Sequence, residues 1–224
     1  MLRTVEPEWL DRVDAADPRA RRSRRDLRRV NFLMGNAGAV ARALAPRLGE
    51  RPTIVDLGAG DGTFMLRTAR KIGQRAAHVM LIDRARAVDA ATVARFRALG
   101  WEATPLAADA TQWLHAASGV DAIVANLFLH HFEGAALARL LALAAARTRL
   151  FIACEPRRSR VALAASRCLW AIGCARETRE DATISVRAGF RAAELAELWP
   201  RAAGWQLSEQ PSGPFGHLFV AELA

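Results

Sequence analysis

A glycine-rich segment that directly follows a buried strand limits the fold of this chain more than any other feature. Thr53–Leu57 is β-branched and apolar, the pattern of a strand that is covered on both faces. Gly58, Gly60 and Gly62 come next, and Thr63–Ile72 then has the pattern of a helix. Glycine allows a sharp turn and a close approach of a ligand to the backbone, and the start of a helix offers free N–H groups. The segment predicts a strand–turn–helix unit that binds a ligand or, in the plainer interpretation, only a tight turn.

Strands and helices alternate along the middle of the chain. The expected elements after the first unit are strand His78–Ile82, helix Val88–Leu99, strand Glu102–Ala107, helix Ala110–Ala116, strand Val120–Asn126, helix Gly134–Arg147 and strand Leu150–Cys154. Such alternation predicts an α/β fold with a parallel sheet that carries helices on both faces. Trp205–Glu209 and His217–Glu222 are too close in sequence for a crossover helix, so we expect an antiparallel hairpin at the edge of the sheet.

Two segments lie outside this alternation. Residues 8–45 have a helical pattern and precede the first strand. Residues 157–200 contain an apolar helix at Val161–Ile172, a polar link with an expected loop at Asp181–Phe190, and a helix near Ala188–Leu198. Open α/β sheets bind ligands beyond the carboxyl ends of their strands. We therefore expect both segments to form a lid over that edge.

Acidic residues are expected at the same edge of the sheet. Asp83 closes the second strand, where a carboxylate can reach the hydroxyls of a ribose bound over the glycine turn. Asp109 follows the third strand and can reach an exocyclic amine on a base, and Asp56 offers negative charge to an ammonium or sulfonium centre. The glycine spacing is GxGxG, and Thr63 stands where a dinucleotide site has its third glycine. The pattern favours a nucleoside ligand other than a dinucleotide.

Val55–Phe64 resembles motif I of the class I S-adenosylmethionine-dependent methyltransferases, and Asp83, Asp109 and Asn126 match further positions of that family. The resemblance covers about residues 50–155 and the terminal hairpin. It implies S-adenosyl-L-methionine as cofactor, S-adenosyl-L-homocysteine as product, and a Rossmann-like sheet of five parallel strands plus a C-terminal antiparallel hairpin. The implied cofactor-binding residues are Asp56, Gly58, Ala59, Gly60, Gly62, Asp83, Arg84, Asp109, Ala110 and Asn126.

We expect a single methyltransferase domain over residues 1–224, because the chain is long enough for one sizeable core and has no linker-like or low-complexity tract. Its expected parts are an N-terminal helical lid (1–48), a cofactor-binding core (49–156), substrate-lid helices (157–200) and a terminal hairpin (201–224).

Candidates for a general base follow the fourth and fifth strands. His130 and His131 have a suitable pKa as imidazoles, with His131 slightly favoured, and Glu155 is a third candidate that polarises an acceptor hydroxyl. The alternatives are structural: the histidines cap or pack the next helix, and Glu155 lies in a salt-bridged strand end. Asn31, Arg157 and Arg187 are the candidate substrate contacts, and surface exposure is the alternative for Arg187.

The segment after the fourth strand excludes two classes of methyl acceptor. Enzymes that methylate the exocyclic amines of nucleobases share an Asn/Asp-Pro-Pro-aromatic run at this place, and Asn126–Leu129 lacks it. The segment also lacks the Pro-Cys that cysteine-dependent cytosine C5 methyltransferases carry here. The leading hypothesis is O-methylation of a small phenolic or carboxylate-bearing metabolite. The alternatives are an RNA methyltransferase that uses the Arg19–Arg29 stripe and a cofactor-binding protein without catalysis.

Charge and cysteine content set further expectations. The formal net charge is +9, and seven arginines lie in Arg19–Arg29. Such a cluster attracts phosphates, an anionic membrane or an acidic substrate, but alanine abundance and a single lysine also point to codon bias, so we favour a small-molecule partner over nucleic acid. No apolar run of about 18 residues occurs, so no membrane span is expected.

The three cysteines form no CxxC pair and no metal-ligand spacing. We therefore expect reduced thiols, no metal site and a cytoplasmic location, in a monomer or homodimer.

Overall fold

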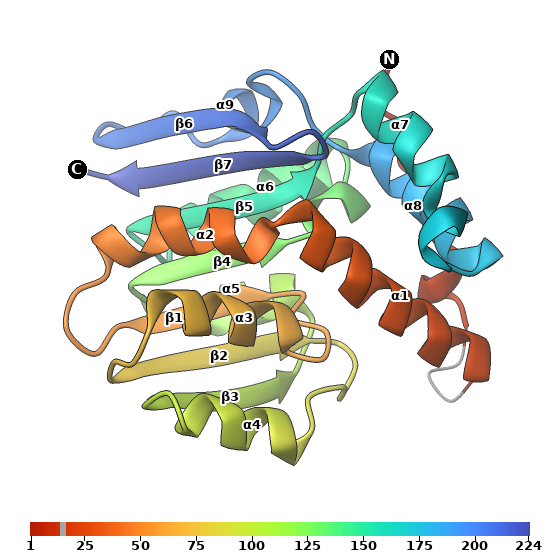
Figure 1. The fold of residues 1–224 in the computed structure, drawn as a ribbon. Coiled ribbons are helices and arrows are strands. Elements are labelled where there is room, and N and C mark those ends of the chain that lie inside the picture. Colours follow the sequence, from red (N-terminus) through yellow and green to blue (C-terminus); the bar gives the residue numbers. More distant parts are fainter. Residues whose placement is uncertain (14–16) are drawn as a thin grey trace.

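The computed structural model describes residues 1–13 and 17–224 and contains one sheet of seven strands (Figure 1). The strand order is β3-β2-β1-β4-β5-β7-β6; the neighbours from β3 to β5 run parallel, and β7 is antiparallel to both β5 and β6. The predicted sheet, five parallel strands plus a terminal hairpin, is confirmed. In chain order the strands are β1 (Thr53–Leu57), β2 (Ala77–Asp83), β3 (Trp101–Ala107), β4 (Ala122–Asn126), β5 (Leu150–Pro156), β6 (Trp205–Ser212) and β7 (Gly216–Leu223).

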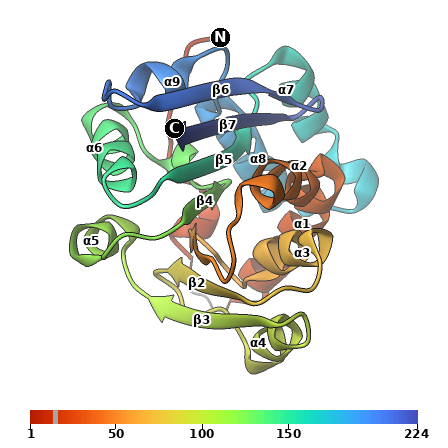
Figure 2. The ribbon, with the colours of Figure 1, turned by 90° about the vertical axis from the view of Figure 1, so that its left-hand side faces the viewer.

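Helices cover both faces of the sheet (Figure 2). One layer contains α2 (Asn36–Leu44), α3 (Thr63–Ile72) and α4 (Ala90–Arg97), and the opposite layer contains α5 (Ala110–Ala116), α6 (Gly134–Ala145) and α9 (Glu194–Leu198). Successive strand residues point to opposite faces, so Ile54 packs in one apolar layer while Val55 and Leu57 pack in the other. The two layers fix the sheet rigidly and leave its carboxyl edge for a site.

A third group of helices lies beyond the carboxyl ends of the parallel strands, at the right of Figure 1. It consists of α1 (Pro18–Met34), α7 (Arg160–Arg167), α8 (Arg176–Ala188) and the 3-10 helices η1 (Trp9–Asp11) and η4 (Leu169–Ile172). The remaining 3-10 helices are η2 (Ala45–Arg47) and η3 (Leu129–His131). Both segments that the sequence placed outside the alternation therefore contribute to this group.

The polar link between the fifth strand and the hairpin was predicted wrongly. The expected loop at Asp181–Phe190 is largely helical, because α8 runs over Arg176–Ala188. This stretch has no internal glycine or proline, and it buries Asp181 among other residues of one face while Arg176 pairs with Glu180 one turn away at 2.7 Å.

The helix expected near Ala188–Leu198 is also wrong in its first half. Ala188 ends α8 and only α9 is helical after it, because Phe190 pairs alongside the end of β5 and residues 192–193 form a turn. The N–H of Phe190 donates to the carbonyl of Pro156 at 2.9 Å, and the guanidinium of Arg158 donates to the carbonyl of Gly189 at 2.9 Å. These contacts hold the segment extended.

Smaller differences affect the element ends. The helix expected at Val161–Ile172 is interrupted at Cys168, where α7 gives way to η4. The hairpin strands pair as far as Ser212 and Gly216, so the connecting turn is shorter than expected. Among the described residues, no helix has the length and apolar character that a bilayer crossing requires.

Candidate active site

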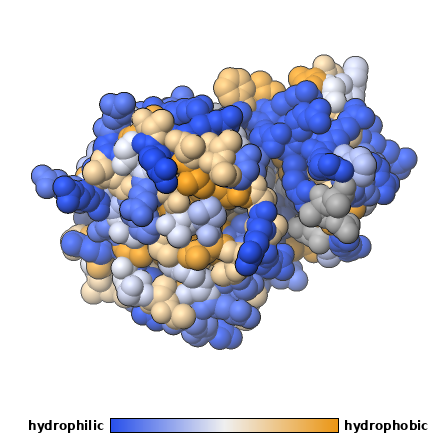
Figure 3. Space-filling model, turned by 90° about the horizontal axis from the view of Figure 1, so that it is seen from below, coloured by the Kyte–Doolittle hydropathy of each residue, from blue (hydrophilic) through white to orange (hydrophobic). Residues whose placement is uncertain are grey.

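A large pocket opens at the carboxyl edge of the sheet, under the third group of helices. Its walls come from the ends of β1, β2 and β4 on one side and from α1, α8 and η4 on the other, and its volume is about 1500 Å³. Seen from below, the surface is hollowed between the body of the molecule and the helical part at the right (Figure 3). Ligand pockets commonly measure about 300–1,000 Å³. This one is large enough for a nucleoside cofactor and a second molecule together.

The glycine turn forms the floor of the pocket. The N–H groups of Gly58 and Ala59 both donate to the carbonyl of Ile82, at 2.9 and 3.0 Å, which ties the turn to β2. A β-carbon on Gly58 would lie 2.8 Å from Cγ of Phe128, whereas one on Gly60 would meet no atom within 4 Å among the described residues. Both glycines have φ in the left-handed region, +71° and +56°. Gly58 therefore allows packing beneath the turn, and Gly60 keeps space free inside the pocket.

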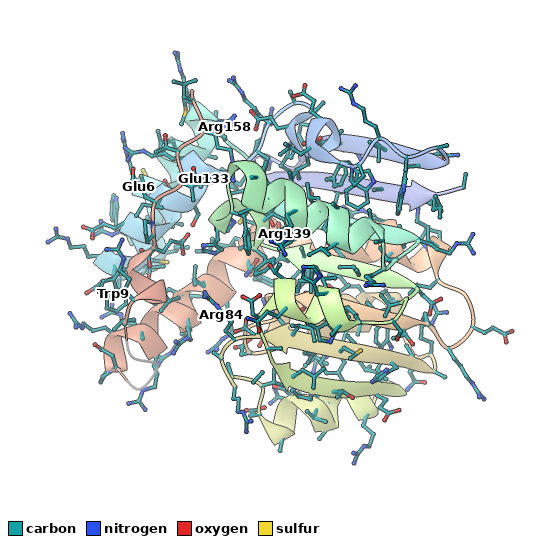
Figure 4. The ribbon with its side chains drawn as sticks, turned by 180° about the vertical axis from the view of Figure 1, so that it is seen from behind. Glu6, Trp9, Arg84, Glu133, Arg139 and Arg158 are labelled. Carbon is teal, nitrogen blue, oxygen red and sulfur yellow. The ribbon has the colours of Figure 1, made fainter. Side chains whose placement is uncertain are left out.

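Asp83 ends β2 and lines the pocket beside Gly60. One carboxylate oxygen accepts from the N–H of Gly60 at 2.9 Å and the other from the N–H of Ala85 at 2.8 Å. Each carboxylate oxygen can accept a second hydrogen bond. Asp83 thus both fixes the turn and retains acceptor capacity for ligand hydroxyls. Arg84 lies next to it at the sheet side of the cleft, and Trp9 stands on the N-terminal arm on the other side (Figure 4).

Asp56, at the end of β1, is a buried acid with unused acceptor capacity. Its side chain is about 1% exposed, and its Oδ2 has no hydrogen-bond partner among the described residues. Burial and the nearby charge of Asp83 raise the pKa of Asp56 well above its ordinary value. A cationic ligand group in the pocket would compensate this carboxylate, so the site fits a ligand with an ammonium or sulfonium centre.

Three asparagines join the lid helices to the sheet. The amide of Asn36 in α2 donates to Oδ1 of Asn126 at the end of β4, at 2.8 Å. The amides of Asn126 and Asn36 both donate to Oδ1 of Asn31 in α1, at 3.2 and 3.4 Å. Asn31 and Asn126 line the pocket as expected, and Asn36 was missed. Its only signal in the sequence was a polar residue at the start of an apolar helix.

An ion pair also connects the lid to the glycine turn. Nη1 of Arg28 in α1 lies 2.7 Å from Oδ2 of Asp61, whose other oxygen accepts from the N–H of Thr63 at 3.0 Å. The sequence placed Arg28 only in the Arg19–Arg29 stripe, and it assigned no role to Asp61. Both line the pocket, so α1 is held over the turn by a charged contact as well as by the asparagines.

Glu155 and His130 form a buried network that does not suit a catalytic base. The carboxylate of Glu155 is fully buried and accepts from the N–H groups of Phe128, Leu129 and His130, at 3.0, 2.9 and 3.3 Å. It also lies 2.8 Å from Nδ1 of His130. This geometry favours the structural alternative for Glu155 over a contact with an acceptor hydroxyl, because both of its oxygens accept hydrogen bonds from the segment that follows β4.

His130 is held between two acids. Its Nε2 lies 3.4 Å from Oε1 of Glu8, which comes from the N-terminal arm. Burial lowers the pKa of His130, but Glu155 and Glu8 outweigh burial and raise it to about 9. An imidazole that is protonated at neutral pH cannot take a proton from an acceptor, so this environment favours the structural alternative for His130 over the role of a base.

His131 remains the base candidate whose side chain lines the pocket and is partly exposed there. Ligand atoms of Glu8, His130 and His131 lie within 4.8 Å of one another, a grouping of residue types that metals use. Because His130 already faces two carboxylates, the ion pairs account for the cluster without a metal. The sequence-based expectation of no metal site stays a prediction.

Several predicted contacts do not lie on the walls of the pocket. Asp109 caps α5 by accepting from the N–H groups of Thr111 and Gln112, at 2.9 and 3.1 Å, and Ala110 begins that helix. The other predicted residues away from the pocket, among those described, are Gly62, which faces the packing between the glycine turn and α4, Arg157, whose N–H donates to Phe215, and Arg187 on the exposed face of α8.

Residues 54–149 match the family model that is described as a methyltransferase domain. The matched segment begins in β1 and ends just before β5, so it contains the glycine turn, Asp83 and Asn126. No curated protein matches the sequence.

Solved structures match over nearly the whole chain. The plantazolicin methyltransferase BpumL in complex with SAH is 15% identical with a TM-score of 0.66, over 93% of this chain and 92% of that one. The magnesium protoporphyrin IX methyltransferase ChlM from Synechocystis PCC 6803 with bound SAM is 12% identical with a TM-score of 0.59, over 96% and 88%. An O-methyltransferase family protein from Burkholderia thailandensis is 17% identical with a TM-score of 0.59, over 94% and 61%. At these identities the likeness concerns the fold.

Proposed function

We propose that this chain, whose residues 54–149 form an S-adenosylmethionine-dependent methyltransferase domain, methylates an oxygen of a small phenolic or carboxylate-bearing molecule. The observation that carries the proposal is the convergence of three features on one pocket: the open glycine turn at Gly60, the carboxylate of Asp83 and the unpartnered buried oxygen of Asp56. The similar structures of BpumL and ChlM hold SAH or SAM, which supports the same cofactor here.

The residues of the pocket fit this cofactor group by group. Asp83 has acceptor capacity for ribose hydroxyls, and Gly60 leaves room for the nucleoside to lie on the backbone. Asp56 offers its carboxylate to the ammonium group of the methionine portion, and Asn126 lies at the same end of the pocket. When bound, the cofactor supplies an electrophilic methyl group on its sulfonium.

The chain's own part in the reaction is alignment and removal of a proton. An acceptor hydroxyl with a high pKa reacts faster when a side chain takes its proton. His131 is the residue proposed for that role, because it reaches the pocket while His130 is held as a cation by Glu155 and Glu8. His130 and Glu155 act as positioning residues that fix the backbone on which His131 stands.

The walls of the outer pocket favour an apolar acceptor. Residues from α7, η4, α8 and the hairpin turn line this part, including Ala165, Leu169, Ile172, Val186 and Phe215. These side chains suit an aromatic or lipophilic ring, and cations that line the same pocket, Arg24 and Arg67 among them, suit a carboxylate on that ring. The apolar side chains support a small molecule over RNA as the acceptor.

Calorimetric titration with S-adenosylmethionine tests the cofactor site. We expect micromolar binding to the parent chain and a loss of about 1–3 kcal/mol in Asp83→Ala, since ribose hydroxyls lose their partner. Asp89→Ala is the matched control: its carboxylate also accepts from a backbone N–H, that of Thr92 at 2.7 Å, but it caps α4 outside the pocket. Equal binding by the parent and Asp83→Ala would refute the assignment.

Transfer of a labelled methyl group then tests the acceptor. The parent chain is incubated with labelled cofactor and separate panels of phenols, aromatic carboxylic acids and RNA. Product in the phenol or acid panels supports the proposal, and product in the RNA panel alone overturns it. Tight cofactor binding with no turnover on any panel would favour the non-catalytic alternative.

A further inference from the structure

The exposed face of α1 carries a basic stripe that continues into apolar residues. Arg22, Arg25 and Arg29 are exposed and lie at spacings that place them on one side of the helix. Phe32 and Leu33 follow on the same side, both about one turn after Arg29, with exposed fractions of 69% and 59%. A helix that only covers the sheet would not be expected to end its outer face with two large apolar side chains.

A second exposed apolar group adjoins this stripe. Trp170 and Ile172 in η4 are 63% and 40% exposed. Ile172 lines one small surface depression together with Arg22, Arg25 and Arg29. The apolar tip of η4 and the arginines of α1 therefore form one continuous surface, which we call the lid face.

Large exposed apolar side chains gather on this part of the molecule. Of the nine among the described residues, five lie on α1, α7 and η4: Phe32, Leu33, Val161, Trp170 and Ile172. Isolated apolar residues at a surface need no explanation, but a cluster marks an interaction site.

We propose that the lid face docks on an anionic lipid bilayer. Side chains of arginine beside tryptophan, leucine and isoleucine are the combination that places a helix in the headgroup region, because the cations attract anionic lipids while the apolar groups enter the acyl boundary. The acid nearest the stripe does not oppose this attraction: Asp26 is buried, and it accepts from Arg29 at 3.2 Å and from the N–H of Ala175 at 2.9 Å.

The same charges would attract RNA, but the apolar part of the lid face argues for a bilayer. Nucleic-acid surfaces bind phosphates through cations and bases through stacking rings. The aliphatic side chains of Leu33 and Ile172 serve neither purpose, whereas a bilayer buries both.

Docking would bring the mouth of the large pocket to the lipid surface. Phe32, Leu33 and Ile172 belong both to the lid face and to the pocket wall. A lipophilic acceptor could then pass from the bilayer into the pocket without crossing water. This consequence rests on the proposed function, whereas docking itself does not.

Vesicle sedimentation tests the docking with the full chain. The parent is mixed with vesicles of phosphatidylcholine and phosphatidylglycerol, and separately with vesicles of phosphatidylcholine alone. We expect strong sedimentation with the anionic vesicles, little with the neutral ones, and a steep loss with added salt. The exposed Cys168, labelled with a polarity-sensitive fluorophore, should report a less polar environment on the anionic vesicles, since Cys154 and Cys174 are buried.

Two variants and a control separate the contribution of the arginines to vesicle binding from that of the apolar side chains. The double variant Arg22→Gln and Arg25→Gln should bind anionic vesicles at least tenfold more weakly, because each cation at the surface contributes substantially. The matched control, Arg95→Gln with Arg97→Gln, removes the same charge from the exposed face of α4 and should bind as the parent does.

Trp170→Ser should bind with weaker affinity and abolish most of the change in fluorescence. Every variant should still bind S-adenosylmethionine, so a failure of docking is distinguishable from a failure of the cofactor site. The proposal is overturned if the parent does not sediment with anionic vesicles, or if the α4 control weakens binding as much as the α1 variant.

Discussion

Replacing Gly58 by alanine puts a methyl group into space that the ring of Phe128 occupies. The added carbon would lie 2.8 Å from Cγ and 3.1 Å from Cβ of that side chain. Phe128 is not free to leave, because its ring packs edge-on against Phe132 and its N–H is bound by Glu155. The substitution therefore forces a shift in the packing beneath the glycine turn.

Two contributions set the size of the effect. A left-handed φ costs a residue with a β-carbon about 1–2 kcal/mol. Overpacking a tight site adds about 1–3 kcal/mol. Gly58→Ala should therefore lose about 2–5 kcal/mol of unfolding free energy. Gly60→Ala has a similar φ but meets no described atom within 4 Å, so it should lose only the first contribution.

Urea unfolding of both variants measures this difference in unfolding free energy. Calorimetric titration with S-adenosylmethionine then compares the cofactor affinities of the two variants. Gly60→Ala should be the more stable variant and yet bind the cofactor at least tenfold more weakly than the parent, because its methyl group points into the open pocket. If Gly58→Ala proves as stable as Gly60→Ala, the contact with Phe128 does not control this position and the reasoning fails.

Three further predictions concern titratable groups of the site. Asp56→Asn should raise the unfolding free energy at neutral pH, because the raised pKa of Asp56 favours the folded state only at low pH and this advantage is lost as pH rises. The same variant should weaken cofactor binding, and a lower unfolding free energy than that of the parent would contradict the assignment. His130 should contribute roughly 3 kcal/mol of stability that is fully present below pH 6.5 and lost as pH rises through about 9; His130→Gln should remove this pH dependence from denaturant unfolding, and an unchanged profile would contradict it. His131→Ala should lower kcat about 10²–10⁴-fold with cofactor affinity unchanged, as single-turnover and binding measurements can check, and full activity would exclude it as the base.

The core of the fold was predictable because its signals are local. β1 is a run of apolar residues, the glycines follow it at once, and Asp83 stands at the end of the next strand. In a parallel sheet those ends meet at one edge, so three short segments were enough to place Asp56, Gly60 and Asp83 in one pocket.

The rest depended on contacts that no local pattern contains. Glu8 meets His130 only because the N-terminal arm crosses the carboxyl edge, and Asn36 meets Asn126 only because α2 packs against the end of β4. The structural interpretation of His130 and Glu155 depends on contacts of the same kind. Local spacing presented both as candidates for chemistry, and only the packed structure places them against each other.

α8 shows how a local signal can mislead. Its sequence is polar and contains β-branched residues, which read as a link. The helix is instead specified from outside: Asp181 accepts from the N–H groups of Trp9 and Leu10, at 2.7 and 3.2 Å. A buried acid that binds a distant segment adds no hydrophobic periodicity to the sequence of its helix.

These contacts of the N-terminal arm have a consequence for the order in which the chain assembles. Glu8 is bound by Ser185 and His130, and the arm that carries it is held by Asp181. All of these partners lie far along the sequence, so these contacts of the arm cannot form until β4, β5 and α8 exist. The arm therefore reaches its place only after elements that follow it by more than a hundred residues have formed, and the pocket acquires that wall at the same stage.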